Sequence, residues 1–256
     1  MSQISPLPPL ASIPSTRDEL VKQLARHDLL DPLIKAQAEA HFVSEYQLSG
    51  DQACTSDRQA IQFLKEQYKF KSDEQFSAWR AAHKLNTDLD LYNYAHHSYK
   101  KNEVLLDLLD GSGESLFLRY KDRLDRVLYS LIRVESEDLA YALYYAIESG
   151  DKEFGDAAAE HSIGPESKTQ GIIGPVDLTT PHPEIAARLR TATPRQLFSP
   201  FEADQWKAVV RLDYRFDSEY DENTKRFLGS LVLSAKAQEY AKLLRDSYLP
   251  IEQEKQ

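Results

Sequence analysis

The sequence predicts an α+β protein with an all-α part and one small antiparallel sheet flanked by helices. Three observations predict it. Apolar residues between positions 15 and 124 recur at helical spacing, without the two-residue alternation of strands. Residues 125–214 then change to a strand-like run, two short helices, a glycine turn, another short helix and two closing strands. Helical spacing returns from residue 221.

The composition fits one or two compact domains. The chain has 256 residues, of which 41% are apolar and 28% charged, and its net charge is −10. This negative charge disfavours a phosphate-backbone partner, so nucleic acid is not expected. The one cysteine, Cys54, excludes an internal disulfide and fits a reducing compartment. It has no neighbouring base, so an incidental thiol is favoured over a catalytic one.

The first residues predict an arm. Residues 1–14 hold four prolines and few residues to bury, so an extended or loose segment is expected. They lack the basic region and continuous apolar run of a signal peptide. The sequence also has no apolar run of about 18 residues, which a membrane span needs. We therefore expect no membrane insertion and a cytoplasmic location.

Capping residues predict where the helices of the first half begin. Thr16 precedes the first helix, and Asp31 is the expected cap of the second, with Pro32 at its first helical position. Ser72 and Thr87 precede later helices in the same way. The first half is therefore expected to be a helical domain.

The final helix, from Asp221, has no partner within a small sheet module, so it is expected to return to the helical domain. A helix over residues 114–124 leads directly into the first strand at Arg126. The predicted parts are a flexible arm (1–14), a helical domain (15–123), a sheet module (124–216) and a C-terminal helix packed on the helical domain (217–256).

Several residues within the sheet module occur at a characteristic spacing. Phe154 and Ala158 are followed four residues later by Ser162, then by the turn Gly171-Ile-Ile-Gly174, and Ser199-Pro-Phe precedes the last strand. In these residues the module resembles the parvulin family of peptidyl-prolyl cis/trans isomerases. With the helical part and the returning helix, the chain looks like parvulin chaperones of the PpiC and SurA type. The strand at 126–134 is similar to that of cyanobacterial parvulin-like proteins.

The resemblance implies a reaction in which no bond is broken. A prolyl bond rotates against a barrier of about 18–20 kcal/mol, and the enzyme stabilises the twisted amide with polar groups. Parvulins typically supply a histidine on the first strand, a cysteine or aspartate after the serine turn, and a histidine on the last strand. By order and spacing these positions fall on Ser130, on Ile163-Gly164 and on Ala208, so all three polar groups are changed.

The resemblance also implies an apolar pocket for the proline ring. Its leucine, methionine and phenylalanine positions fall on Ile173, near Pro181 and on Ile185, so an aliphatic hollow without an aromatic wall is expected. The candidate substrate-binding residues are Ile173, Pro181, Ile185, Phe201 and Ala208. The candidate catalytic hydrogen-bonding residues are Ser130, His161 and His182.

Three functions remain open from the sequence. The changed polar positions favour a chaperone that binds proline-containing or extended polypeptide, with weak or lost isomerase activity. The alternatives are an active, divergent isomerase and a non-catalytic scaffold in a peptide maturation or export complex. An enzyme should keep an open groove between Ser130, Ile173, Ile185 and Ala208. In a scaffold that groove should be filled, for example by Tyr129 or Trp206.

No cofactor or metal is expected. His96 and His97 are adjacent, so on a helix their side chains point about 100° apart and chelate one ion poorly. The other histidines have no cysteine or carboxylate cluster at ligand spacing. Solvated or capping histidines are therefore favoured over metal ligands.

Overall fold

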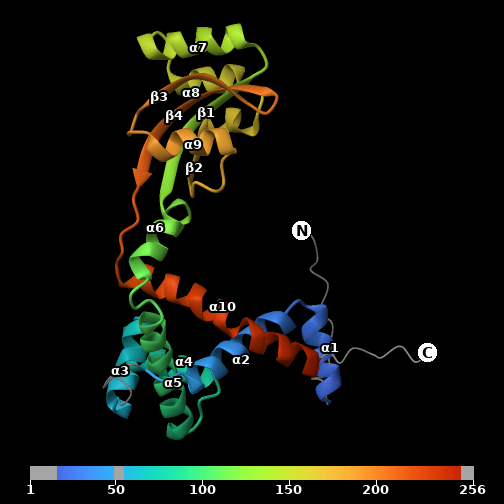
Figure 1. Cartoon of the computed structure of the whole chain (residues 1–256), viewed down its shortest axis with the longest axis vertical. Helices are drawn as coiled ribbons and strands as arrows, with labels where there is room; N and C mark the ends of the chain where they lie inside the picture. The colour runs from blue at the N-terminus through green and yellow to red at the C-terminus, as the bar shows by residue number, and fades with distance from the viewer. Residues whose placement is uncertain (1–15, 49–54, 249–256) are drawn as a thin grey trace, which may run out of the picture. The chain divides into compact units, whose positions relative to one another are not determined.

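The computed structural model describes residues 16–48 and 55–248. The predicted arm over residues 1–14 and Cys54 lie outside the described residues. The chain divides into two compact units, which we call the helical unit (residues 1–111 and 225–256) and the sheet unit (residues 112–224) (Figure 1). The predicted α+β fold is confirmed.

The helical unit consists, over its described residues, of helices without strands. Its elements are α1 (Arg17–Arg26), α2 (Leu30–Glu45), α3 (Asp57–Gln67), α4 (Asp73–Ala82), α5 (Asp88–Asp107) and α10 (Glu222–Tyr248), which starts at the unit boundary. The predicted caps of α1, α4 and α5 are confirmed. Thr16, Ser72 and Thr87 each accept a hydrogen bond from the backbone N–H three residues later.

The predicted start of α2 is wrong, because the N-cap residue is Leu29 and not Asp31. The helix begins at Leu30, and its N-cap residue Leu29 makes no side-chain cap bond. Asp31 instead lies in the first turn, where a carboxylate stabilises the positive end of the helix dipole. Pro32 is tolerated there because the first N–H groups of a helix have no intrahelical partner.

Helix α10 supplies core residues to the helical unit along its length. Leu233 is fully buried with Val43 of α2 and with Val104 and Leu105 of α5. Closer to its end, Ala241, Leu244 and Tyr248 pack against the buried residues of α1 and α2, which are Val21, Leu30 and Ile34. The long C-terminal helix therefore contributes to two clusters that the first half of the chain does not complete alone.

The sheet unit contains four antiparallel strands in the order β2-β1-β4-β3 (Figure 1). Its elements are α6 (Gly113–Leu124), β1 (Arg126–Val134), α7 (Glu137–Ser149), α8 (Phe154–His161), η2 (Pro165–Thr169), β2 (Ile172–Val176), α9 (Pro183–Thr191), β3 (Leu197–Ala203) and β4 (Trp206–Phe216).

Alternation along β1 gives the sheet two apolar faces. Val127, Tyr129 and Leu131 belong to a cluster with residues of α9, and we call this side the α9 face. Ile132 and Val134 belong to a second cluster with residues of α7 and α8, and we call this side the α7/α8 face. Both faces are covered, which is why apolar residues of β1 point to both sides of the sheet.

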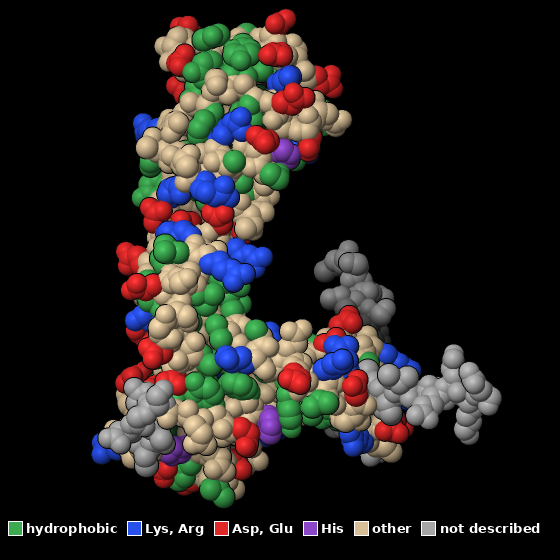
Figure 2. All heavy atoms as spheres, viewed as in Figure 1, with side chains coloured by type: hydrophobic (Ala, Val, Ile, Leu, Met, Phe, Trp, Pro, Cys, Tyr) green, Lys and Arg blue, Asp and Glu red, His purple; other side chains and the backbone are tan. Residues whose placement is uncertain are grey.

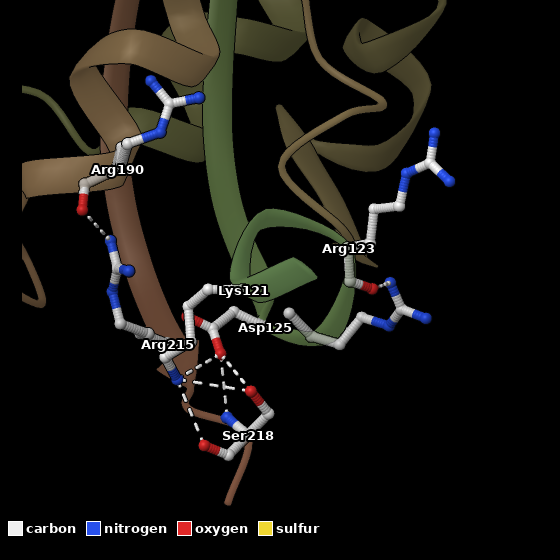
Figure 3. A network of polar contacts seen from close by, with 7 residues as sticks. Lys121, Arg123, Asp125, Arg190, Arg215 and Ser218 are labelled. Atoms are coloured by element: carbon white, nitrogen blue, oxygen red, sulfur yellow. Dashed lines mark hydrogen bonds and ion pairs between the residues drawn. The ribbon is translucent and has the colours of Figure 1, made fainter. Parts of the chain in front are cut away.

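A buried carboxylate holds together the two places where the chain enters and leaves the sheet (Figure 3). Asp125, which is 2% exposed, follows α6, and its Oδ1 accepts bonds from Lys121 Nζ at 2.6 Å and from the Ser218 N–H at 2.9 Å. Burial alone would raise the pKa of Asp125, but the bonds from Lys121 and Ser218 outweigh it and lower the pKa. The segment after β4 is thereby fixed to the end of α6.

Helix α6 belongs with the sheet unit in the structure. The division falls between Gly111 and Ser112, earlier in the chain than the predicted boundary after residue 123. The reason is local bonding: the Leu178 N–H donates to the Asp122 carbonyl, and Arg190 of α9 forms an ion pair with the Asp122 carboxylate at 2.7 Å.

Gly229 controls how closely α10 approaches α5. A Cβ atom at this position would lie 2.3 Å from the Leu105 carbonyl oxygen, which is backbone and cannot rotate away. In an exposed helix Gly→Ala stabilises by about 0.5–1 kcal/mol. We expect Gly229→Ala instead to lower the free energy of unfolding by about 1–3 kcal/mol through overpacking. Urea denaturation followed by circular dichroism measures it, with Ser230→Ala as the neighbouring control. A stabilised Gly229→Ala variant would contradict this packing.

Candidate functional site

The candidate apolar residues come together on the α9 face. Ile185 and Ala208 belong to its buried cluster, and Ile173 and Phe201 pack against that cluster. Phe201 of β3 pairs with Ala208 of β4, which in turn pairs with Arg133 of β1. The fifth candidate, Pro181, is buried in the segment between β2 and α9.

This face is filled. Ile185 is 4% exposed, Ala208 is fully buried, and Tyr129 is 4% exposed within the same cluster. Burial raises the pKa of Tyr129 to about 12, which agrees with a ring enclosed by apolar groups. Trp206, in contrast, is half-buried at the start of β4 and is not among the residues of this cluster. Tyr129 is thus buried in the same cluster as Ile185 and Ala208, which were expected to border an open groove.

A cation covers the aromatic ring at the side of this face. The Arg188 guanidinium carbon lies 3.7 Å from the centre of the Phe201 ring, within cation–π distance. Arg188 is held there by Glu184, whose carboxylate lies 2.8 Å from Nη1 one helical turn earlier. The edge of the α9 face at Phe201 is therefore also occupied by protein.

Ser130 lies on the opposite, α7/α8 face. Its neighbours Tyr129 and Leu131 hold the α9 face, so the alternation of β1 turns Ser130 away from Ile185 and Ala208. Its Oγ donates to Asp213 Oδ2 at 2.6 Å, and the same carboxylate accepts from Arg211 Nε at 2.7 Å. The expectation that Ser130 borders one groove with Ile185 and Ala208 is corrected by this geometry.

The two candidate histidines are bound to different carboxylates. His161 ends α8, with Nε2 3.4 Å from Glu160 and 3.2 Å from Lys152 Nζ. His182 is the N-cap of α9, where Nδ1 accepts from the Glu184 N–H and Nε2 lies 3.0 Å from Asp204. With Ser130 bound to Asp213, the three polar candidates make no hydrogen bond to one another among the described contacts.

An ion pair that was not expected from the sequence lies on the α9 face. Arg133 of β1 donates through Nε to Glu166 Oε1 at 2.9 Å and through Nη2 to Glu166 Oε2 at 2.5 Å. Ser162 Oγ also donates to Glu166 Oε1 at 2.6 Å, and Ser162 Oγ accepts from the Arg133 N–H at 3.0 Å. Burial alone would raise the pKa of Glu166, but the bonds from Arg133 and Ser162 outweigh it and lower the pKa.

This ion pair occupies the space beside Gly164, one of the two residues, Ile163 and Gly164, on which the cysteine or aspartate position falls. A Cβ atom at Gly164 would lie 2.2 Å from Arg133 Nη2 and 2.2 Å from Glu166 Oε2. The pair therefore fills the space into which a thiol or carboxylate at residue 164 would project. One sequence signal could have revealed it: an arginine inside an apolar strand needs an anionic partner.

Few polar groups on the α9 face remain free to bind a ligand. Arg133 is 29% exposed, and its Nη1 group has no partner among the residues that the structure describes. It can donate to a carbonyl of a bound peptide, but its charge is already neutralised by Glu166. Positioned donors stabilise a transition state only when they are free to face it. The geometry therefore suits contact with a peptide better than stabilisation of a rotating prolyl amide.

The helical unit contains an open groove between α2 and α10. Its volume is about 920 Å³, within the range of ligand sites. Ile34 and Ala38 of α2 and Ala237 and Ala241 of α10 line it, and each pair is one helical turn apart. Charged side chains of both signs border it, namely Asp31, Lys35, Glu239, Lys242 and Arg245.

No group of three or more histidine, cysteine or carboxylate side chains among residues 16–48 and 55–248 is placed to hold a metal ion. None of the helices in these ranges is long and apolar enough to cross a membrane.

Solved structures similar to this chain are peptidyl-prolyl isomerases and SurA-like chaperones. PrsA of Bacillus anthracis is 17% identical, with 85% of this chain and 95% of that chain covered and a TM-score of 0.40. A SurA-like chaperone of Campylobacter jejuni is 16% identical, with 94% and 96% covered and a TM-score of 0.36. The parvulin domain of PpiD from E. coli is 23% identical, with 38% and 94% covered and a TM-score of 0.33. No protein-family model and no curated protein matches the sequence.

The Glu166 carboxylate should make stability depend on pH. Its pKa in the folded chain lies below the ordinary 4.5, so its contribution is complete above pH 4.5 and is lost as the pH falls through the folded value. We expect Glu166→Gln to lower the free energy of unfolding by about 1–3 kcal/mol near neutral pH, discounted for the exposure of Arg133. The difference should shrink below pH 4.5. Urea denaturation at several pH values measures it, with exposed Glu153→Gln as control; a pH-independent difference would refute the assignment.

Ser130 should matter for stability and not for ligand binding. Ser130→Ala removes a bond to the Asp213 carboxylate in a buried position, which should lower the free energy of unfolding by about 1–3 kcal/mol. Titration with a proline-containing peptide should give an unchanged Kd, because Ser130 faces α7 and α8. The exposed Ser199→Ala is the matched control. Lost peptide binding in a stably folded Ser130→Ala variant would show that the residue serves the ligand.

Proposed function

We propose that this chain is a parvulin-like chaperone that binds extended or proline-containing polypeptide and has weak or no isomerase activity. The observation that carries the proposal is the open groove between α2 and α10, which is apolar at its base and charged at its borders. The resemblance of the sheet module to parvulins, on Phe154, Ala158, Ser162 and the Gly171–Gly174 turn, supports the family assignment.

The groove suits an extended chain for physical reasons. Ala38 and Ala237, which are 0% and 2% exposed, are small and leave room for a backbone to approach both helices. Lys35 is 64% exposed, so it can meet a carboxylate of a client without a large desolvation cost, whereas Arg245 is already paired with Asp31 at 2.5 Å. Lys242 and Glu239 offer both signs on α10, which fits clients of varied sequence.

The filled α9 face supports the second half of the proposal. An isomerase needs an accessible apolar pocket and free polar groups beside it. Here Tyr129 and Ile185 are buried, Ala208 has no exposed atom, and the guanidinium of Arg133 is paired with Glu166. The buried α9 face also favours a second candidate function for the sheet unit. It would act as a non-catalytic scaffold that has the parvulin-like fold without isomerase activity.

Exchange NMR on short Xaa-Pro peptides tests the isomerase half. We expect no acceleration of cis/trans exchange by catalytic amounts of the full chain, because the filled face offers the prolyl ring no pocket. A parvulin serves as the positive control for the peptides. Acceleration comparable to that of the parvulin control would contradict the proposal and establish a divergent isomerase.

Peptide titration tests the binding half. Ala235 lines the groove and is exposed, so Ala235→Trp should fill the groove without disturbing a core. We expect this variant to weaken Kd for an unfolded, proline-containing peptide about tenfold, or about 1.4 kcal/mol. Ser247→Trp, on the exposed side of the same helix, is the matched control and should bind normally. Equal binding by both variants would exclude the groove as the binding site. If neither the unaltered chain nor the variants bind the peptide, the scaffold function is the one that remains.

A further inference from the structure

Helix α7 exposes large apolar side chains on the side turned away from the sheet. Ala140 and Leu143 are buried against the α7/α8 face of the sheet. Leu139, Tyr141 and Tyr145 are 36%, 38% and 59% exposed. Figure 2 shows hydrophobic side chains gathered over α7, with acidic side chains around them. Exposed apolar side chains that lie together, rather than singly, indicate an interaction surface.

The tyrosines of this helix form a connected group of rings. Tyr141 and Tyr145 are one turn apart, with ring centres separated by 6.2 Å, and Tyr144 meets Tyr145 edge-on at 5.3 Å. The Tyr144 hydroxyl donates to Glu148 Oε1 at 2.6 Å, which raises the pKa of Tyr144 and holds the carboxylate beside the rings. Aromatic faces next to a carboxylate attract cations.

The charge around these rings has one sign. Between residues 135 and 151 the charged side chains are all acidic: Glu135, Glu137, Asp138, Glu148 and Asp151. Glu137 lies 3.5 Å from Lys207. Across the described part of the chain, Glu148 and Asp151 have no lysine, arginine or histidine within ion-pair distance. The carboxyl end of α7 therefore presents uncompensated negative charge, to which the helix dipole adds.

A hollow lies at this end of the helix. It measures about 470 Å³ and is lined by Tyr145, Ala146, Glu148, Ser149 and Asp151. Ser149 Oγ donates to Asp151 Oδ2 at 2.7 Å, and Asp151 lines the hollow. The hollow thus joins an aromatic wall to two carboxylates.

We propose that the exposed Tyr141–Tyr145 side of α7, with this hollow, is a docking site for a basic polypeptide segment of another protein. A lysine or arginine of the partner lies against the Tyr145 ring and pairs with Glu148 and Asp151. Apolar partner residues cover Tyr141. The inference concerns the sheet unit alone and does not depend on the groove between α2 and α10.

The negative charge of the site distinguishes a basic polypeptide from the other molecules that could occupy it. A second copy of this chain would bring the same acidic helix to the site, and like charges at short distance oppose that contact. Nucleic acid and anionic membranes carry the same sign as the site and are disfavoured for the same reason. A basic polypeptide is the partner whose chemistry matches both the rings and the carboxylates.

Fluorescence anisotropy of the full chain tests the proposal. The probe is a fluorescein-labelled peptide of repeated Arg-Leu-Gly, and the matched probe has glutamate in place of arginine. We expect Tyr145→Ala to weaken the arginine peptide about threefold, as for an exposed cation–π contact. We expect the double variant Glu148→Gln, Asp151→Asn to weaken it by about threefold as well. Raising the salt concentration should reduce binding by the unaltered chain.

Two controls separate this site from others. Tyr214→Ala removes a tyrosine that is 54% exposed elsewhere in the sheet unit and should leave Kd unchanged. Ser247→Trp, on the exposed side of α10 and outside the groove, should also leave it unchanged. Circular dichroism of each variant confirms that it is folded. Equal affinity for the arginine and glutamate peptides, no measurable binding, or a Tyr145→Ala variant that binds as tightly as the unaltered chain would each overturn the proposal.

Discussion

The buried Glu166 carboxylate is the constraint around which one end of the sheet is built. A carboxylate at this depth is stable only when paired and hydrogen-bonded, and Arg133 and Ser162 meet that need. Their positions have consequences in turn: Gly164 has to lack a side chain, and the Gly171 N–H donates to the Glu166 carbonyl where the chain enters β2. Together they leave this end of the α9 face without a free acid, base or thiol.

The two units therefore differ in what they offer a ligand. On the α9 face, Tyr129, Ile185 and Ala208 form a continuous apolar layer that is complete without a substrate. Between α2 and α10, by contrast, the small side chains Ala38 and Ala237 leave a groove in the helical unit. The apolar layer of the sheet unit is thus buried, whereas the groove of the helical unit is open to a ligand.

Much of the fold could be predicted because it follows from local signals. The Ser72 and Thr87 caps and the glycine after α7 each act within a few residues. The site was harder because it depends on which way each side chain of β1 points. A shift of one residue moves Ser130 from one face to the other, and spacing alone does not fix that register. The pairing of Arg133 with Glu166 joins residues far apart in the sequence, so no local pattern contains it.

The insertion of the sheet unit between two segments of the helical unit has a consequence for synthesis on the ribosome. Residues 112–224 emerge before α10, so the sheet unit can fold while the helical unit still lacks Leu233, Ala241 and Leu244. Domains generally fold from the N-terminus as the chain grows, but here the unit that starts first finishes last. The apolar sides of α2 and α5 stay uncovered until α10 has been synthesised, so the incomplete helical unit exposes apolar surface during translation.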